Sequence, residues 1–172
     1  MQNQFFKEAI SSEIFSVITE ASKQLQIDSY VIGGFVRDFF LQRGTAKDID
    51  VVAVGSGIEL AKKVAELLPN KPQVQVFKTY GTAMLRFKEV EIEFVGARKE
   101  SYTEDSRNPE VSEGTLQDDQ NRRDFTINAL ALSLNENNFG ELLDPFNGTK
   151  DLENKIIKTP LNPDITYSDD PL

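Results

Sequence analysis

Two aspartates separated by one residue form the clearest chemical motif of the sequence. Asp48 and Asp50 are followed by the uncharged run Val51–Val54, and β-branched and apolar residues of this kind predict a buried strand. Residues two apart in a strand point to the same face, with Cα atoms about 6.5–7 Å apart. Most Asp-x-Asp sequences are solvated pairs in turns, but carboxylates on a buried strand need neutralising, which a divalent cation does. Asp48 and Asp50 are therefore candidate catalytic residues and metal ligands.

A glycine pair is the second candidate. Gly33 and Gly34 separate the predicted strand Tyr30–Ile32 from a segment in which apolar residues resume helical spacing at Phe35. Glycines at the start of a helix let a ligand approach the backbone, whose free N–H groups and dipole favour an anion such as a triphosphate. Arg37 lies in the first turn, where its guanidinium would reach a phosphate oxygen. A plain tight turn explains a glycine pair about as often, so both interpretations stay open.

A third carboxylate is the next candidate. Two short apolar runs, Thr82–Phe87 and Val90–Val95, predict a hairpin. If its second strand lies beside the strand of the two aspartates, Glu93 becomes a third carboxylate near the same metal ions. Glu91 points to the same face of that strand, so the choice between the two glutamates stays open. An ordinary exposed glutamate is the alternative for either residue.

The basic residues of a later segment are a further candidate. Arg122, Arg123, Asp124 and Asn128 are predicted to lie on one helix that is apolar over much of its circumference. Asp124 and Asn128 are four residues apart and would be neighbours on that helix. An exposed basic pair is the ordinary explanation of the arginines, but the apolar surroundings favour ordered partners. The polar stretch Ser101–Gln117 predicts a long loop, which we expect to be mobile and to close over a bound ligand.

The remaining elements must hold these groups in place. Apolar spacing predicts a helix from Ile10 to near Gln26, a helix over Ile58–Leu68, a strand over Val74–Phe77, a strand at Leu142-Leu143 and a short helix from Lys150. No regular pattern is predicted from Thr159 onward. This order of helices and strands predicts an α+β fold with a mixed central sheet of about five strands flanked by helices.

Composition restricts the available chemistry. The 172 residues include neither Cys nor His, which excludes disulfides, cysteine or histidine metal ligands, thiol nucleophiles and a Ser-His-Asp triad. With 19 Lys and Arg against 28 Asp and Glu, the net charge is −9, and the chain as a whole would repel a nucleic-acid backbone unless a local basic site or a further segment attracts it. No apolar run has membrane length and no export signal is visible, so we expect a cytoplasmic protein without membrane contact.

The order of these motifs is that of a known family. A glycine pair, two aspartates on a strand and a third carboxylate resemble the nucleotidyltransferase superfamily that includes DNA polymerase beta-like enzymes. More narrowly, from about Tyr30 onward the chain resembles the head domain of the class II tRNA nucleotidyltransferase (CCA-adding enzyme) and bacterial poly(A) polymerase family. Four motifs carry this resemblance: Val31-Ile32-Gly33-Gly34-Phe35-Val36-Arg37-Asp38, Lys47-Asp48-Ile49-Asp50, Arg122-Arg123-Asp124-Phe125-Thr126-Ile127-Asn128-Ala129-Leu130 and Asp144-Pro145-Phe146-Asn147-Gly148.

The resemblance implies a role for each residue of the first two motifs. Gly33 and Gly34 would cradle the triphosphate of CTP or ATP, and Arg37 would contact it. Asp48 and Asp50 would hold two Mg²⁺ ions, of which one would activate the 3′-hydroxyl of the RNA and the other would stabilise the leaving pyrophosphate. This chemistry needs no histidine.

The third motif is implied to bind the nucleotide. Arg123 would contact its phosphates or ribose, Asp124 its ribose hydroxyl, and Asn128 would support that segment. The activity implied is transfer of CMP and AMP from CTP and ATP to the tRNA 3′ end. Within the family, the alternatives are a poly(A) polymerase or an enzyme that adds only CC or only A. From another class, the alternative is a non-catalytic nucleotide-binding module, which paired metal ligands disfavour.

The C-terminus departs from the family pattern. In the family, an Asp-Asp-Pro-Leu-Arg motif opens a helical neck domain, and a later Glu-Asp-x-x-Arg template pairs with the incoming base. The sequence contains Asp169-Asp170-Pro171-Leu172 but no such template. We therefore expect residues 1–158 to form the catalytic head and 159–172 to begin the connection to a neck domain absent from this chain. The head alone is expected to be inactive or weakly active, with the RNA-binding basic surface on the neck and tail. The oligomeric state is not predicted.

Overall fold

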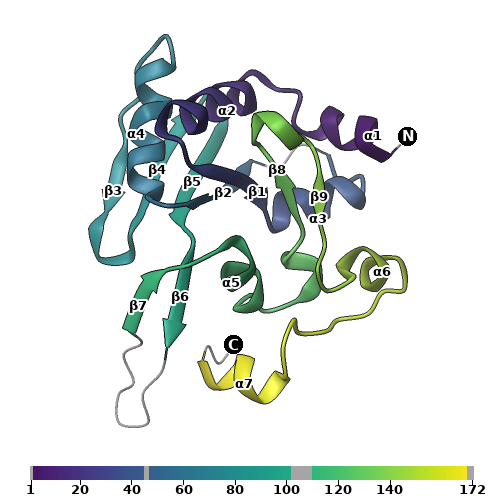
Figure 1. Ribbon diagram of the computed structural model, residues 1–172. Coiled ribbons are helices and arrows are strands. Elements are labelled where there is room, and N and C mark those ends of the chain that lie inside the picture. Colours follow the sequence, from purple (N-terminus) through teal and green to yellow (C-terminus); the bar gives the residue numbers. More distant parts are fainter. Residues whose placement is uncertain (1, 45–46, 102–109, 170–172) are drawn as a thin grey trace.

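The computed structural model describes residues 2–44, 47–101 and 110–169 (Figure 1). The α-helices are α1 (Gln2–Ala9), α2 (Glu13–Leu25), α3 (Gly34–Phe40), α4 (Gly57–Leu67), α5 (Leu116–Asn121), α6 (Gly148–Glu153) and α7 (Pro163–Asp169), and the short 3₁₀ helices are η1 (Lys78–Tyr80), η2 (Thr126–Asn128) and η3 (Glu136–Asn138). The strands are β1 (Asp28–Ile32), β2 (Asp48–Val54), β3 (Gln75–Phe77), β4 (Thr82–Phe87), β5 (Val90–Gly96), β6 (Arg98–Ser101), β7 (Glu110–Glu113), β8 (Ala131–Ser133) and β9 (Leu142–Leu143).

The main sheet is mixed, as predicted. In the described residues it has seven strands in the order β3-β4-β5-β2-β1-β8-β9, while β6 and β7 form a separate hairpin. β2 and β5 are parallel, and the other neighbouring pairs are antiparallel. The sheet is wider than expected partly because β8, which the sequence pattern places in a helix, pairs with β1 and β9. Three residues are too few to display the alternation of a strand.

Helices α2 and α4 cover one face of this sheet (Figure 1). Phe15 of α2 and Leu60 of α4 belong to one hydrophobic cluster with Val51 of β2, and all three are essentially inaccessible to solvent. The opposite face is partly covered by α5, whose Leu116 packs with Ile32 of β1 and Val52 of β2. Because side chains alternate along a strand, these two clusters fix the face to which each neighbouring residue points.

The predicted N-terminal helix begins three residues later than expected, and a separate helix that was not predicted precedes it. Helix α1 ends at Ala9 and α2 begins at Glu13, so the buried Ile10 lies between them rather than inside a helix. Helix α2 ends as predicted, since Gln26 follows it in the left-handed conformation with φ 57°. Helix α4 and the β4–β5 hairpin also agree with the prediction.

The prediction of one loop over Ser101–Gln117 is wrong in its described parts. β7 pairs with β6, and α5 begins at Leu116, while residues 102–109 lie outside the described residues. Backbone pairing and the capping box of Thr115 create these elements, and neither requires apolar periodicity. The helix predicted to carry the two arginines is also wrong, because α5 ends just before them. The tail is helical over α7, where no regular element was expected.

Within the described residues, no helix combines the length and the apolar character needed to cross a membrane.

The first prediction concerns the contact of α4 with the sheet. A Cβ on Gly57 would lie 2.7 Å from the carbonyl carbon of Val95. Alanine usually stabilises a helix relative to glycine, but here we expect Gly57→Ala to lower the free energy of unfolding by about 1–3 kcal/mol because the backbone must shift. Urea unfolding measures the change. Lys62→Ala, on the exposed side of the same helix, is the control and should have little effect; equal behaviour of the two variants would contradict the packing argument.

Candidate active site

The pairing of β2 with β5 brings four carboxylates to one face of the sheet. Asp48 lies opposite Glu91, and Asp50 lies opposite Glu93, in parallel register. The intervening residue Ile49 points into the core beneath α2 and α4, so the carboxylates point to the other face. A third carboxylate near Asp50 was expected only if the two strands were adjacent, and the pairing of β2 with β5 confirms that they are.

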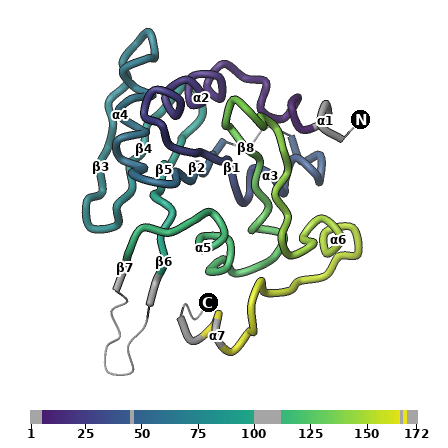
Figure 2. The backbone as a smooth tube through the Cα atoms, viewed as in Figure 1, coloured from purple at the N-terminus to yellow at the C-terminus, as the bar shows by residue number. Residues whose placement is uncertain are grey.

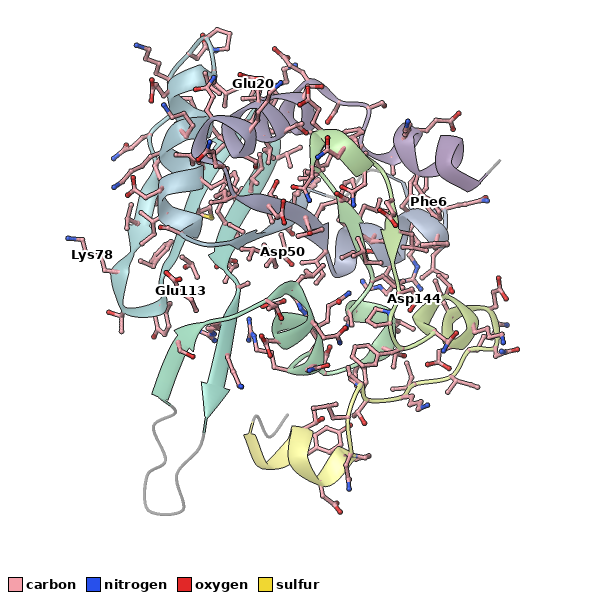
Figure 3. All side chains as sticks on the ribbon, viewed as in Figure 1. Phe6, Glu20, Asp50, Lys78, Glu113 and Asp144 are labelled. Carbon is pink, nitrogen blue, oxygen red and sulfur yellow. The ribbon has the colours of Figure 1, made fainter. Side chains whose placement is uncertain are left out.

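Asp50 is the half-buried member of this group, and Figure 3 labels it near the centre of the molecule. Its burial raises the pKa of the carboxyl group, Arg123 opposes this rise, and the negative charges of Glu93 and Asp48 add to it. Within the described part of the chain, no hydrogen bond reaches its carboxylate. Of the two glutamates, Glu93 is the direct cross-strand neighbour of Asp50, and its negative charge raises the pKa of the Asp50 carboxyl, so it is the stronger candidate for a third carboxylate.

Gly33 occupies the tight turn between β1 and α3, as the sequence predicts. Its N–H donates to the carbonyl of Leu130 at 3.1 Å, and its φ of +79° is one that L side chains rarely adopt. A Cβ at this position would lie 3.3 Å from Nη1 of Arg123, 3.6 Å from Oδ2 of Asp50 and 3.7 Å from the carbonyl oxygen of Asn128. The turn therefore joins the face of the four carboxylates to the segment of the two arginines, and a side chain at Gly33 would be strained by the positive φ and close to Arg123.

Arg37 is held by its neighbour Asp38 and by Asn128, which is far away in the sequence. Its Nη1 donates to Oδ1 of Asn128 at 2.7 Å, and its Nε donates to Oδ1 of Asp38 at 2.9 Å. Asn128 Nδ2 in turn donates to both carboxylate oxygens of Asp124, at 3.0 and 3.2 Å. The contact predicted between Asp124 and Asn128 is thus present, although a turn followed by η2 carries it rather than an α-helix. The structure brings all three residues into one hydrogen-bonded chain.

The two arginines share a partner that sequence reasoning missed. Arg122 donates to Oδ1 of Asp119 at 3.2 and 2.8 Å, and Arg123 donates to its Oδ2 at 3.1 and 3.0 Å. Asp119 is fully buried. An acid three and four residues before two consecutive arginines is the signal that would have found it, because such spacings are neighbours on a helix.

The turn that carries the arginines is fixed on both sides. Before it, Gln120 Nε2 donates to the carbonyl of Ala129 at 2.7 Å. After it, Thr126 Oγ1 donates to Oδ2 of Asp151 at 2.7 Å. Helix α6, which carries Asp151, begins where Asp144 accepts hydrogen bonds from the N–H groups of Gly148 and Thr149. The Asp144–Gly148 motif therefore fixes the start of α6, which in turn holds the end of the arginine segment (residues 122–126) through Thr126.

The acidic face fits a magnesium site that is completed by a ligand. Within the described residues, no three His, Cys, Asp or Glu side chains come close enough to form a metal site by themselves. Mg²⁺ is usually held by one or two carboxylates together with substrate phosphates and water. Asp50, half-buried and without a hydrogen bond from the described residues, and the exposed Asp48 beside it have the donor chemistry for this arrangement.

The second prediction compares the two glycines of the turn. Gly33→Ala places a Cβ on a backbone with positive φ and close to Arg123, and we expect a loss of about 1–3 kcal/mol in the free energy of unfolding. Gly34→Ala is the matched control, since its Cβ would meet only Nη2 of Arg37, at 3.6 Å, inside a helix. Urea unfolding of both variants measures the difference. A loss at Gly33 no larger than that at Gly34 would contradict the assigned geometry.

Comparison with known proteins identifies the family. The model of the poly A polymerase head domain matches residues 29–158. An A-adding tRNA nucleotidyltransferase of Aquifex aeolicus is 40% identical over 144 residues, which are 84% of this chain and 17% of that protein. A CCA-adding enzyme of Anoxybacillus flavithermus is 33% identical over 172 residues, covering 99% of this chain and 39% of that enzyme.

Solved structures agree with this result. A tRNA nucleotidyltransferase complexed with a primer tRNA and an incoming ATP analog matches with a TM-score of 0.73 and 34% identity, over 90% of this chain and 41% of that one. The chain thus spans well under half the length of each of these three proteins. From its four ordered motifs, its mixed sheet and its acidic face beside the glycine turn, the chain belongs to the poly A polymerase head domain family of nucleotidyltransferases.

Proposed function

We propose that this chain is the catalytic head of a tRNA nucleotidyltransferase that adds CMP and AMP from CTP and ATP to the tRNA 3′ end and releases pyrophosphate. One observation carries the proposal: Oδ2 of Asp50 and Nη1 of Arg123 lie within 3.6 Å of the same point above Gly33. A carboxylate and a guanidinium converging on a glycine turn supply a cation ligand and an anion ligand side by side, which is what a metal-bound triphosphate requires.

The glycine turn and two arginines are proposed to bind the triphosphate. Gly33 and Gly34 would allow phosphate oxygens to approach the backbone. Arg37 would donate to them from the first turn of α3, held in place by its bond to Asn128. Arg123 would donate from the opposite side through its remaining Nη1.

The ribose is proposed to lie against Asp124. This carboxylate accepts from the N–H of Phe125 and from Nδ2 of Asn128, and a carboxylate has lone pairs for a further donor, which a ribose hydroxyl would supply. Asn128 would keep the Asp124 carboxylate oriented while it joins the ribose site to the Arg37 phosphate site.

Asp48 and Asp50 are proposed to hold two Mg²⁺ ions. When bound, the ions supply activation of the 3′-hydroxyl and stabilisation of the leaving pyrophosphate. Glu93 would contribute a third negative charge beside Asp50, which favours cation binding on this face. The cations would also offset the part of the chain's negative charge that lies at this site.

The substrate of the whole protein is proposed from its relatives. A-adding, CCA-adding and CC-adding tRNA nucleotidyltransferases match this chain at 40%, 33% and 39% identity. The head thus carries the transfer chemistry common to these enzymes, and poly(A), CC-only or A-only addition is the alternative within the family. We propose residues 1–158 as the head and 159–172 as the start of a connection to a neck domain that would bind RNA, in a cytoplasmic protein.

The third prediction tests the proposed chemistry. In the protein that contains this chain, Asp50→Asn should reduce Mg²⁺-dependent incorporation of CTP and ATP into a tRNA lacking its 3′ CCA by on the order of 100-fold or more, because loss of a ligand costs at least as much as loss of its supporting partner. Labelled-nucleotide incorporation and sequencing of the product measure this. Asp28→Asn, at the exposed far end of neighbouring β1, is the matched control; retained activity in Asp50→Asn overturns the metal assignment.

The fourth prediction concerns base selection. We expect the 172-residue chain to bind ATP and CTP in the presence of Mg²⁺ weakly and with similar affinity, because the proposed contacts involve phosphates and ribose rather than the base. Isothermal titration calorimetry with each nucleotide measures the two dissociation constants. A strong preference for one nucleotide would contradict this expectation and show that base-reading groups lie in the head. If neither nucleotide binds in a Mg²⁺-dependent way, that result counts against the proposed function.

A further inference from the structure

A single buried carboxylate holds both arginines of the site. Oδ1 of Asp119 accepts two hydrogen bonds from Arg122, and Oδ2 accepts two from Arg123. The Asp119 side chain has no exposed surface, while the side chains of Arg122 and Arg123 are 32% and 19% exposed. The carboxylate of Asp119 thus lies inside the protein, and the two arginine side chains reach the surface.

The helix that carries Asp119 is itself fixed. Its N-terminus is closed by a capping box between Thr115 and Asp118, and Leu116 is buried against the sheet. Gln120 donates to the carbonyls of Ala129 and Leu143, at 2.7 and 3.3 Å. Figure 2 shows α5 below β1 and β2, on the side away from α2. Asp119 is therefore attached to the sheet through its neighbours.

This attachment fixes the plane of the Arg123 guanidinium. Nε and Nη2 both bond to Oδ2 of Asp119, so the planar group cannot rotate without breaking them. Within the described residues, Nη1 makes no hydrogen bond, and it lies 3.3 Å from the Cβ position of Gly33. Of the donors that the two bonds to Asp119 leave free, those of Nη1 therefore lie at the glycine turn.

The same attachment keeps Arg123 from Asp50. Both groups lie beside the same point at Gly33, and a released guanidinium would form an ion pair with the half-buried Asp50 carboxylate. In such a pair, Arg123 would no longer be free to bind phosphate and Asp50 would no longer be free to bind a metal ion.

We propose that Asp119 is a positioning residue, which directs Nη1 of Arg123 toward the triphosphate and keeps Arg123 from pairing with Asp50. This inference rests on the proposed function and deepens it. A guanidinium that is ordered before binding loses little freedom when the ligand arrives, so Asp119 strengthens binding without touching the nucleotide.

The test is a double-mutant cycle on ATP binding. In the 172-residue chain with Mg²⁺, we expect Asp119→Asn to weaken ATP binding by about tenfold, measured by calorimetry. In the Arg123→Ala background, the same substitution should have no further effect, because Asp119 acts through Arg123. A general structural role would instead add its effect in both backgrounds. Asp119→Asn with unchanged affinity, or with the same loss in both backgrounds, overturns the inference.

The neighbouring aspartate provides the matched control. Asp118 accepts from the N–H and Oγ1 of Thr115 and is not bonded to either arginine. Asp118→Asn should weaken the cap of α5 but leave ATP affinity within about twofold. If Asp118→Asn loses affinity to the same extent as Asp119→Asn, helix integrity rather than guanidinium position is responsible, and the inference fails.

A measurement on the unmutated chain does not depend on the folding of any variant. The Nε–H signal of Arg123 in a ¹H–¹⁵N spectrum should exchange slowly with water, because it is bonded to a buried carboxylate, and it should shift when tripolyphosphate is added. Rapid exchange, or no shift in a chain that calorimetry shows to bind ATP, overturns the inference. If the unmutated chain does not bind ATP, the proposed function fails instead, and slow exchange still decides whether Asp119 holds Arg123.

Discussion

Parallel pairing of β2 with β5 determines where the charged groups of the site lie. The register places Asp50 beside Glu93 and Asp48 beside Glu91, with Ile49 and Ile92 facing the helices. A slip of one residue in either strand would turn its carboxylates into the apolar core, where their burial would cost far more than their pairing returns. The hydrophobic layer beneath α2 and α4 thus fixes the acidic face above it.

The glycine turn meets this face because β1 is the other neighbour of β2. Ile32, the last residue of β1, pairs with Asp50, so the next residue, Gly33, must lie next to that carboxylate. β8 follows on the far side of β1, and the arginine segment leads directly into it. Three motifs, of which Arg37 and Asn128 are 91 residues apart, therefore meet because β2, β1 and β8 are neighbours in the sheet.

Much of this arrangement could be predicted from local patterns. Strong sequence signals mark the Asp48–Val54 strand, the β4–β5 hairpin and the turn at Gly33. β-Branched runs and glycine pairs determine the local backbone conformation without help from residues distant in the sequence. Helix α5 had no such signal, since Leu116 is its one apolar residue. Its position depends on a cap and on long-range bonds of Gln120. Asp119 was missed although its spacing to Arg122 and Arg123 was visible in the sequence, because no local pattern shows that its carboxylate is buried.

The anchoring of the arginine segment at both ends limits how the site can change shape. Gln120 connects its start to Ala129 and to Leu143 of β9, and Thr126 connects its end to α6. Segments held in this way belong to the least mobile part of a protein, because they open only when the surrounding elements open with them. If one pocket accepts first CTP and then ATP, the exchange would leave Arg123 and Asp124 in place. The phosphate and ribose contacts would then be the same for both nucleotides, and only the contacts to the base would differ.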